Sequence, residues 1–93
     1  MTSILIFEPY SGGHHTNYIE AIVAQLGKLD VSLIICTNDR HNFRAPFPAT
    51  VELDTSLPRF KPPADLRTKF SIGGALRSAV KRHRPEVVIS TTA

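Results

Sequence analysis

Along this chain, short apolar runs rich in β-branched residues alternate with segments in which apolar residues recur at helical spacing. The runs predict strands at four places, the third of them short and alternating: 3–9, 31–37, 49–54 and 86–90. The resulting order of elements is β-α-β-β-α-β. This order is typical of an α/β protein with an open parallel sheet of Rossmann type and right-handed crossovers.

The first helix is predicted directly after a Gly-Gly turn. Its apolar residues recur at helical spacing: Tyr18, Ile19, Ile22, Val23, Leu26 and Leu29. Asn17 is the predicted N-cap residue, because Glu20 follows three residues later in an arrangement close to a capping box.

The second helix has two candidate starting points, Asp65 and Ser71. The later start is considered because Gly73 and Gly74 each cost about 1 kcal/mol relative to alanine inside a helix. The end of this helix is better defined, since a basic run that suits the negative end of a helix dipole comes just before Pro85.

Composition indicates one small domain over residues 1–93, with 42% hydrophobic and 20% charged residues. The net charge of +3 is too small to identify a partner.

The single cysteine, Cys36, excludes an internal disulfide and a cysteine-based zinc site, and we expect it to pack as a small hydrophobe. No apolar run approaches the roughly 20 residues of a membrane-spanning helix. With no leader pattern visible, we expect a cytoplasmic protein.

The segment SGGHHTN (11–17) lies where parallel-sheet proteins bind ligands, beyond the carboxyl end of the first strand. Glycines at Gly12 and Gly13 allow close backbone approach, and a helix N-terminus favours a phosphate. The segment matches neither GxGxxG nor a P-loop. It has two interpretations: a ligand site, or a tight turn with exposed histidines. Adjacent side chains at His14 and His15 diverge in extended structure, and no carboxylate or cysteine cluster lies nearby in the sequence, so we expect no metal site. We also expect no cofactor.

The strand, SGGH turn, amphipathic helix, second strand, proline-rich middle and RPEVVIST together resemble the N-terminal domain of a GT-B-fold glycosyltransferase. The resemblance is to family-4-type enzymes and to lipid-acceptor enzymes with a GGH turn, such as the lipid-linked N-acetylglucosaminyltransferase and diacylglycerol glycosyltransferases. It covers essentially the whole chain, although only SGGH and RPEVVIS are specific. Two departures are the absence of a further glycine at 9–11 and of a proline after His14.

The resemblance implies that the glycine turn faces the interdomain cleft and that His14 is a candidate general base toward an acceptor hydroxyl. Together with positions at the same sheet edge, the candidate substrate-binding residues are Gly12, Gly13, His15, Thr16, Asn17, Thr91 and Thr92. The complete enzyme would transfer a sugar from a nucleotide-sugar donor to an acceptor. Because the family binds the donor mostly through a C-terminal domain, we expect the 93 residues to be inactive alone.

Three residues follow the last predicted strand, whereas a buried parallel strand normally continues into a covering helix. We therefore expect the first part of a larger domain, completed by a C-terminal domain or a partner chain. The alternative is a non-catalytic α/β binding module that completes its sheet with a partner.

Basic and aromatic residues mix between Arg40 and Phe70. This mixture has two interpretations: a peripheral membrane contact, or a solvated loop with aromatic rings tucked under it. No motif for nucleic-acid binding is present. Glu8 has two interpretations, a side chain that reaches the cleft or a solvated surface residue, and we expect the latter. We interpret His41 as a solvated loop residue and His83 as a solvated helix-end residue.

Overall fold

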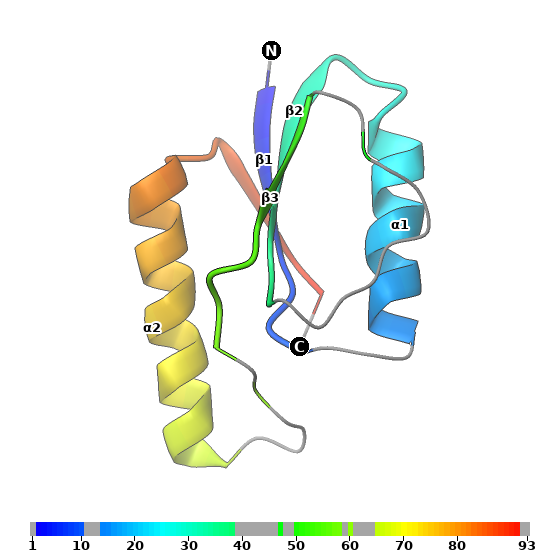
Figure 1. Cartoon of the computed structure of the whole chain (residues 1–93). Helices are drawn as coiled ribbons and strands as arrows, with labels where there is room; N and C mark the ends of the chain where they lie inside the picture. Colours follow the sequence, from blue (N-terminus) through cyan, green and yellow to red (C-terminus); the bar gives the residue numbers. More distant parts are fainter. Residues whose placement is uncertain are drawn as a thin grey trace.

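The computed structural model describes residues 2–10, 14–38, 47, 50–58, 60 and 65–91, without the side chains of residues 14 and 15. Four parallel strands form one open sheet in the order β3-β2-β1-β4: β1 (Thr2–Phe7), β2 (Val31–Cys36), β3 (Val51–Asp54) and β4 (Val87–Ser90). Helices α1 (His14–Leu26) and α2 (Leu66–His83) lie on opposite faces of this sheet (Figure 1). The predicted Rossmann-like α/β fold is confirmed. Within the described ranges, no helix is both long and apolar enough to cross a membrane.

The two central strands are apolar at nearly every position because both faces of the sheet are covered. Successive side chains of a strand point to opposite faces of the sheet, so β1 and β2 each contribute residues to two hydrophobic clusters, one on each face. The cluster under α1 contains Ile4, Ile6, Ile19, Val23, Leu33 and Ile35. The cluster under α2 contains Leu5, Phe7, Ile34, Cys36, Leu57 and Ala79.

The sheet changes winding direction between β1 and β4. From β1 the chain crosses to β2 through α1 on one face, and from β3 it crosses to β4 through α2 on the other face (Figure 1). In open parallel sheets, such a switch point leaves a crevice beyond the carboxyl ends of the two strands, where ligands bind. The segment that follows β1 starts at this crevice.

Helix α1 begins at His14, three residues before the predicted N-cap. Asn17 is instead an exposed residue within the first turns, so the prediction that it caps the helix is wrong. A cap preference is worth only about 1 kcal/mol, which tertiary contacts can override. Leu29 lies beyond the helix end and is 60% exposed, and Tyr18 is 57% exposed, so neither belongs to the buried face.

Helix α2 takes the earlier of its two candidate starts. Asp65 is the N-cap residue, and its carboxylate accepts the Thr68 N–H at 2.7 Å. The helix continues through both glycines to His83. Arg84 then adopts a left-handed conformation, with φ 48° and ψ 53°, and its N–H donates to the Val80 carbonyl. The predicted stop before Pro85 is confirmed.

Candidate functional site

Two side chains that follow β2, those of Thr37 and Asn38, form hydrogen bonds with the backbone just after β1. The Thr37 hydroxyl donates to the Glu8 carbonyl at 2.8 Å, and the Asn38 amide donates to the Pro9 carbonyl at 3.2 Å. These four residues are fully buried. Because buried carbonyls need hydrogen-bond partners, the two side chains fix the backbone at residues 8 and 9, where it leaves β1.

The Glu8 side chain also belongs to this buried exit. It is 0% exposed, and its Oε2 accepts the Tyr10 N–H at 3.1 Å. The expectation of a solvated surface residue is therefore wrong. The backbone folds back over the carboxylate within two residues and supplies a donor in place of water. Tyr10 in turn forms an isolated parallel bridge with Phe60.

A cavity of about 340 Å³ opens at the switch point, between α2 and the carboxyl ends of β1 and β4. It is lined by Phe7, Tyr10, Lys69, Ile72, Gly73, Leu76 and Ser90. Apolar side chains dominate this lining, and a phenol, an ammonium and a hydroxyl group add polar contacts. Such a combination is typical of small-molecule sites, and the lysine favours a ligand that bears a negative charge.

Several of the predicted site residues cannot be placed against this cavity. Gly12, Gly13 and Thr92 lie outside the described residues. His14 and His15 are the first two residues of α1, and the structure does not describe their side chains. Their roles therefore stay predictions.

The other three predicted site residues are described. Thr16 is half-buried in the first turn of α1, and Asn17 is exposed beside it. Thr91 directs its backbone N–H and its hydroxyl to the Phe7 carbonyl, at 3.2 and 3.3 Å. Thr91 thus joins the exit of β4 to that of β1, the same carbonyl edge that Thr37 and Asn38 stabilise from the other side.

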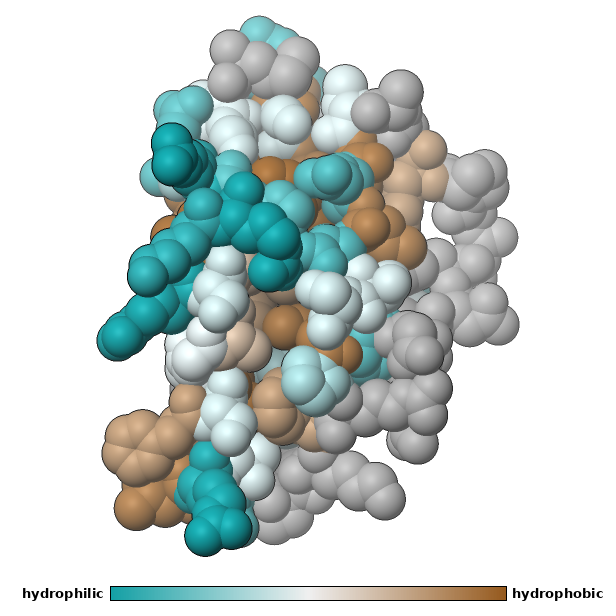
Figure 2. Space-filling model, turned by 60° about the vertical axis from the view of Figure 1, so that its left-hand side comes forward, coloured by the Kyte–Doolittle hydropathy of each residue, from teal (hydrophilic) through white to brown (hydrophobic). Residues whose placement is uncertain are grey.

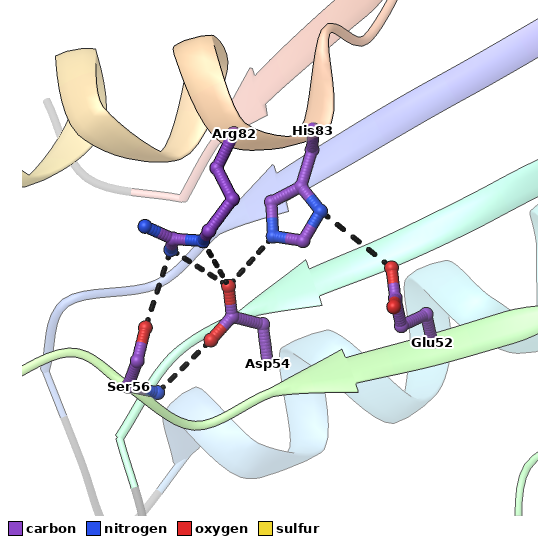
Figure 3. A network of polar contacts seen from close by, with 5 residues as sticks. All are labelled: Glu52, Asp54, Ser56, Arg82 and His83. Atoms are coloured by element: carbon purple, nitrogen blue, oxygen red, sulfur yellow. Dashed lines mark hydrogen bonds and ion pairs between the residues drawn. The ribbon is translucent and has the colours of Figure 1, made fainter.

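A second polar cluster joins the end of α2 to the edge strand β3 (Figure 3). The guanidinium of Arg82 lies 2.7 Å from Asp54 Oδ2 and 3.2 Å from Ser56 Oγ. The His83 ring lies between two carboxylates, with Nε2 2.6 Å from Asp54 Oδ2 and Nδ1 3.6 Å from Glu52 Oε2. The Ser56 N–H donates to Asp54 Oδ1 at 3.0 Å.

The contacts of this cluster indicate a structural role. The His83 side chain is only 12% exposed, so the prediction of a solvated helix-end histidine is wrong. Its two ring nitrogens face Asp54 and Glu52, which holds the imidazole in place and leaves no nitrogen turned toward an incoming substrate (Figure 3). An open cavity of about 550 Å³ adjoins the cluster, but its charged groups already contact one another. The cluster fastens α2 to β3.

Cys36 is an inert core residue, as predicted. Burial, and next the negative charge of Asp54, raise the pKa of its thiol to about 11. A thiol with this pKa is protonated at neutral pH and is a poor nucleophile.

The pocket residues Tyr10, Lys69 and Ser90 were not identified from the sequence. They lie on three segments far apart in the chain, and only the sheet order brings them together. Among the described residues, no group of three or more histidine, cysteine, aspartate or glutamate side chains could hold a metal ion. Comparison with family models, curated proteins and solved structures finds no match to this chain.

Proposed function

We propose that this chain is the N-terminal, acceptor-side portion of a GT-B-fold glycosyltransferase. It would act together with a donor-binding half outside these 93 residues. The observation that supports this proposal most directly is the cavity of about 340 Å³ at the β1/β4 switch point, next to the exit of β1. Open α/β sheets bind nucleotide-containing ligands at this place.

The proposed division of labour follows the resemblance of the SGGH turn. Gly12 and Gly13 would let the backbone approach a phosphate or an acceptor. The oxygen of the acceptor hydroxyl would attack the anomeric carbon of the donor sugar, and the nucleotide would leave. His14 would accept the proton that this hydroxyl loses. Lys69, which lines the cavity, would attract the negative charge of a phosphate.

The alternative proposal is a non-catalytic module that completes its sheet with a partner chain. It is favoured by the outer edge of β4, which has one hydrogen-bonded neighbour, β1, among the described strands. Val87 and Val88 on this strand are 44% and 41% exposed. An apolar, uncharged edge strand of this kind is suited to pairing with another chain.

Two neighbouring glycines of α2 provide a matched pair of variants for testing the cavity. A methyl group added at Gly73 or at Gly74 meets no atom within 4 Å. Both alanine variants should therefore stabilise the helix by a similar amount, on the order of 1 kcal/mol each. Only Gly73 lines the cavity, so only Gly73→Ala places its methyl group there.

The test is an NMR titration of the folded chain with UDP, GDP and their sugar conjugates. We expect amide shifts at Tyr10, Lys69, Gly73 and Ser90. Gly73→Ala should weaken binding by roughly tenfold through crowding, while Gly74→Ala should leave the affinity unchanged. A well-dispersed spectrum that no ligand shifts would contradict a nucleotide-facing cavity, and equal effects of the two variants would place the ligand elsewhere. If no ligand shifts the spectrum and the chain self-associates as its concentration rises, the result would favour the non-catalytic module that pairs through its sheet edge.

A further inference from the structure

The switch-point cavity has an apolar inner end. Phe7, which is 1% exposed, and Leu76, from the middle of α2, both belong to the hydrophobic cluster under α2 and both line the cavity. Ile72 continues this apolar wall one turn earlier along the helix. A ligand ring that packs against these side chains would displace water from an apolar surface, which favours binding without any charge.

The lining of the cavity contains a single charged group. Helix α2 has five arginines and lysines among its 18 residues, and Lys69 is the one that lines the cavity. Figure 2 shows teal residues projecting from the face that carries the later turns of α2, where Arg77 and Lys81 are exposed. Lys69 lies about two turns before Leu76, and the first turns of α2 extend past the carboxyl ends of the strands (Figure 1). Lys69 therefore lies at the mouth of the cavity.

The size and the polar groups of the cavity narrow the class of ligand. A volume of about 340 Å³ equals that of roughly eleven water molecules, which is enough for one ring with a short substituent. A sugar ring would bring several hydroxyl groups, whereas the polar side chains of the lining are those of Tyr10, Lys69 and Ser90. A nucleoside diphosphate would bring several negative charges, and its phosphates fit the mouth beside Lys69 rather than the apolar interior. The interior therefore fits a neutral ring with few polar groups.

We propose that the switch-point cavity binds a small neutral aromatic alcohol, of the phenol type, as the acceptor. The ring would pack against Phe7, Ile72 and Leu76, because aromatic rings bury a large apolar area and favour contact with other rings. The hydroxyl group would lie beside Tyr10 and Ser90, whose own hydroxyl groups are able to donate or accept a hydrogen bond.

This inference rests on the proposed transferase and names the class of its acceptor. The phenol oxygen would form a bond to the anomeric carbon of the donor sugar, and the bond from that carbon to the nucleotide phosphate would break. His14, four residues after Tyr10 in the sequence, would take the proton that the phenol loses. Lys69 at the mouth would remain available to the phosphate of the donor.

The contribution of the hydroxyl groups is tested with matched variants. Tyr10→Phe and Ser90→Ala each remove one hydroxyl group from the lining, so each should weaken the binding of a phenol about fivefold. The controls make the same two changes elsewhere. Tyr18→Phe changes an exposed residue of α1, and Ser78→Ala changes an exposed residue of α2 outside the lining, so both should leave binding unchanged. A well-dispersed NMR spectrum verifies that each variant is folded.

The contribution of the apolar wall is tested by changing the ligand, because Phe7 and Leu76 also stabilise the core. Phenol, 4-methylphenol and 4-ethylphenol form a series in which each added carbon buries further apolar surface. Their affinities should rise by about three- to fourfold for each carbon. Methyl glucoside is the control for a ring that carries several hydroxyl groups, and we expect it not to bind.

The experiment is an NMR titration of the folded chain with these four ligands, in the absence of nucleotide. We expect 4-ethylphenol to shift the amides of Ile72, Gly73 and Leu76, with a dissociation constant in the millimolar range. Three results would overturn the proposal: a folded chain that no phenol shifts, binding of methyl glucoside as tight as that of 4-ethylphenol, or equal losses in the control variants.

The same spectra separate this inference from the proposed function on which it rests. Shifts caused by nucleotides but by no phenol would overturn the aromatic acceptor and leave the transferase proposal standing. Shifts caused by phenols but by no nucleotide would support the aromatic site and contradict the nucleotide-facing cavity.

Discussion

Removing the charge of Asp54 tests whether the polar cluster between α2 and β3 stabilises the fold. Asp54→Asn keeps the size of the side chain and an oxygen for the Ser56 N–H, but it weakens the contacts with Arg82 and His83. Arg82 is 45% exposed, so its ion pair is worth only about 0.5 kcal/mol. The shorter contact with the His83 side chain, which is only 12% exposed, is worth about 1.5 kcal/mol. We expect the variant to lose about 2 kcal/mol of unfolding free energy at neutral pH.

The loss should also depend on pH in a defined direction. Burial raises the pKa of Asp54, but hydrogen bonds from His83, Ser56 and Arg82 outweigh burial and lower it well below its ordinary value. The unfolded chain binds a proton at about pH 4, whereas the folded chain keeps the carboxylate charged to lower pH. The stabilisation is therefore fully present above about pH 4 and declines as the pH falls further.

Urea unfolding of both proteins between pH 7 and pH 3 measures these two effects. Glu52→Gln is the control, because the Glu52 side chain is 65% exposed and lies 3.6 Å from His83, and it should cost less than about 0.5 kcal/mol. The difference between wild type and Asp54→Asn should shrink at the acidic end. A loss no larger than that of the control would refute the assignment of the cluster to stability, and a loss of constant size at every pH would refute the contribution of the Asp54 charge.

The two ends of α2 allow two further predictions, both measured by urea unfolding. Arg84→Gly should stabilise the protein by roughly 0.5–1 kcal/mol, because Arg84 adopts a left-handed φ of 48° that disfavours residues with a Cβ atom. Lys81→Gly, inside the helix, should destabilise it, and a loss of stability in Arg84→Gly would contradict the cap assignment. Asp65→Ala should cost about 1 kcal/mol, because the Thr68 N–H loses its acceptor. Asp65→Ser should restore most of this loss, and an alanine variant as stable as wild type would show that the cap is dispensable.

Strands β1, β2 and β4 were predictable from the sequence because their apolar runs are short, continuous and rich in β-branched residues, whereas β3 was predictable from its alternation. The buried run of β2 is distinguished from a buried helix segment by its length of six residues and by its β-branched residues. Helix starts were harder to predict, since capping preferences are small compared with tertiary contacts. The aspartate before α2 was identified as a candidate start and is a cap, whereas Asn17 fits the capping pattern equally well and lies inside α1.

The candidate site was predictable in place but not in composition. The carboxyl edge after β1 follows from the order of elements alone. By contrast, Lys69 reaches the cavity from a helix that starts more than 50 residues later, and nothing in its local sequence distinguishes it from other lysines. The burial of Glu8 and His83 was missed for the same reason, because their partners, Tyr10 on the returning chain and Asp54 on β3, depend on folded geometry.

Helix α2 is anchored to the core over only part of its length. The side chains that pack under it begin at Ile72 and include Ala75, Leu76, Ala79 and Val80, while the residues from Leu66 to Ser71 contribute none. The glycine pair at 73–74 lies near the junction of the two parts. The first turns can therefore fray and re-form as a separate local unit of low stability, while the later turns open only when the whole domain unfolds. The surface offered at the start of α2 is thus adjustable, whereas its other end is fixed to β3.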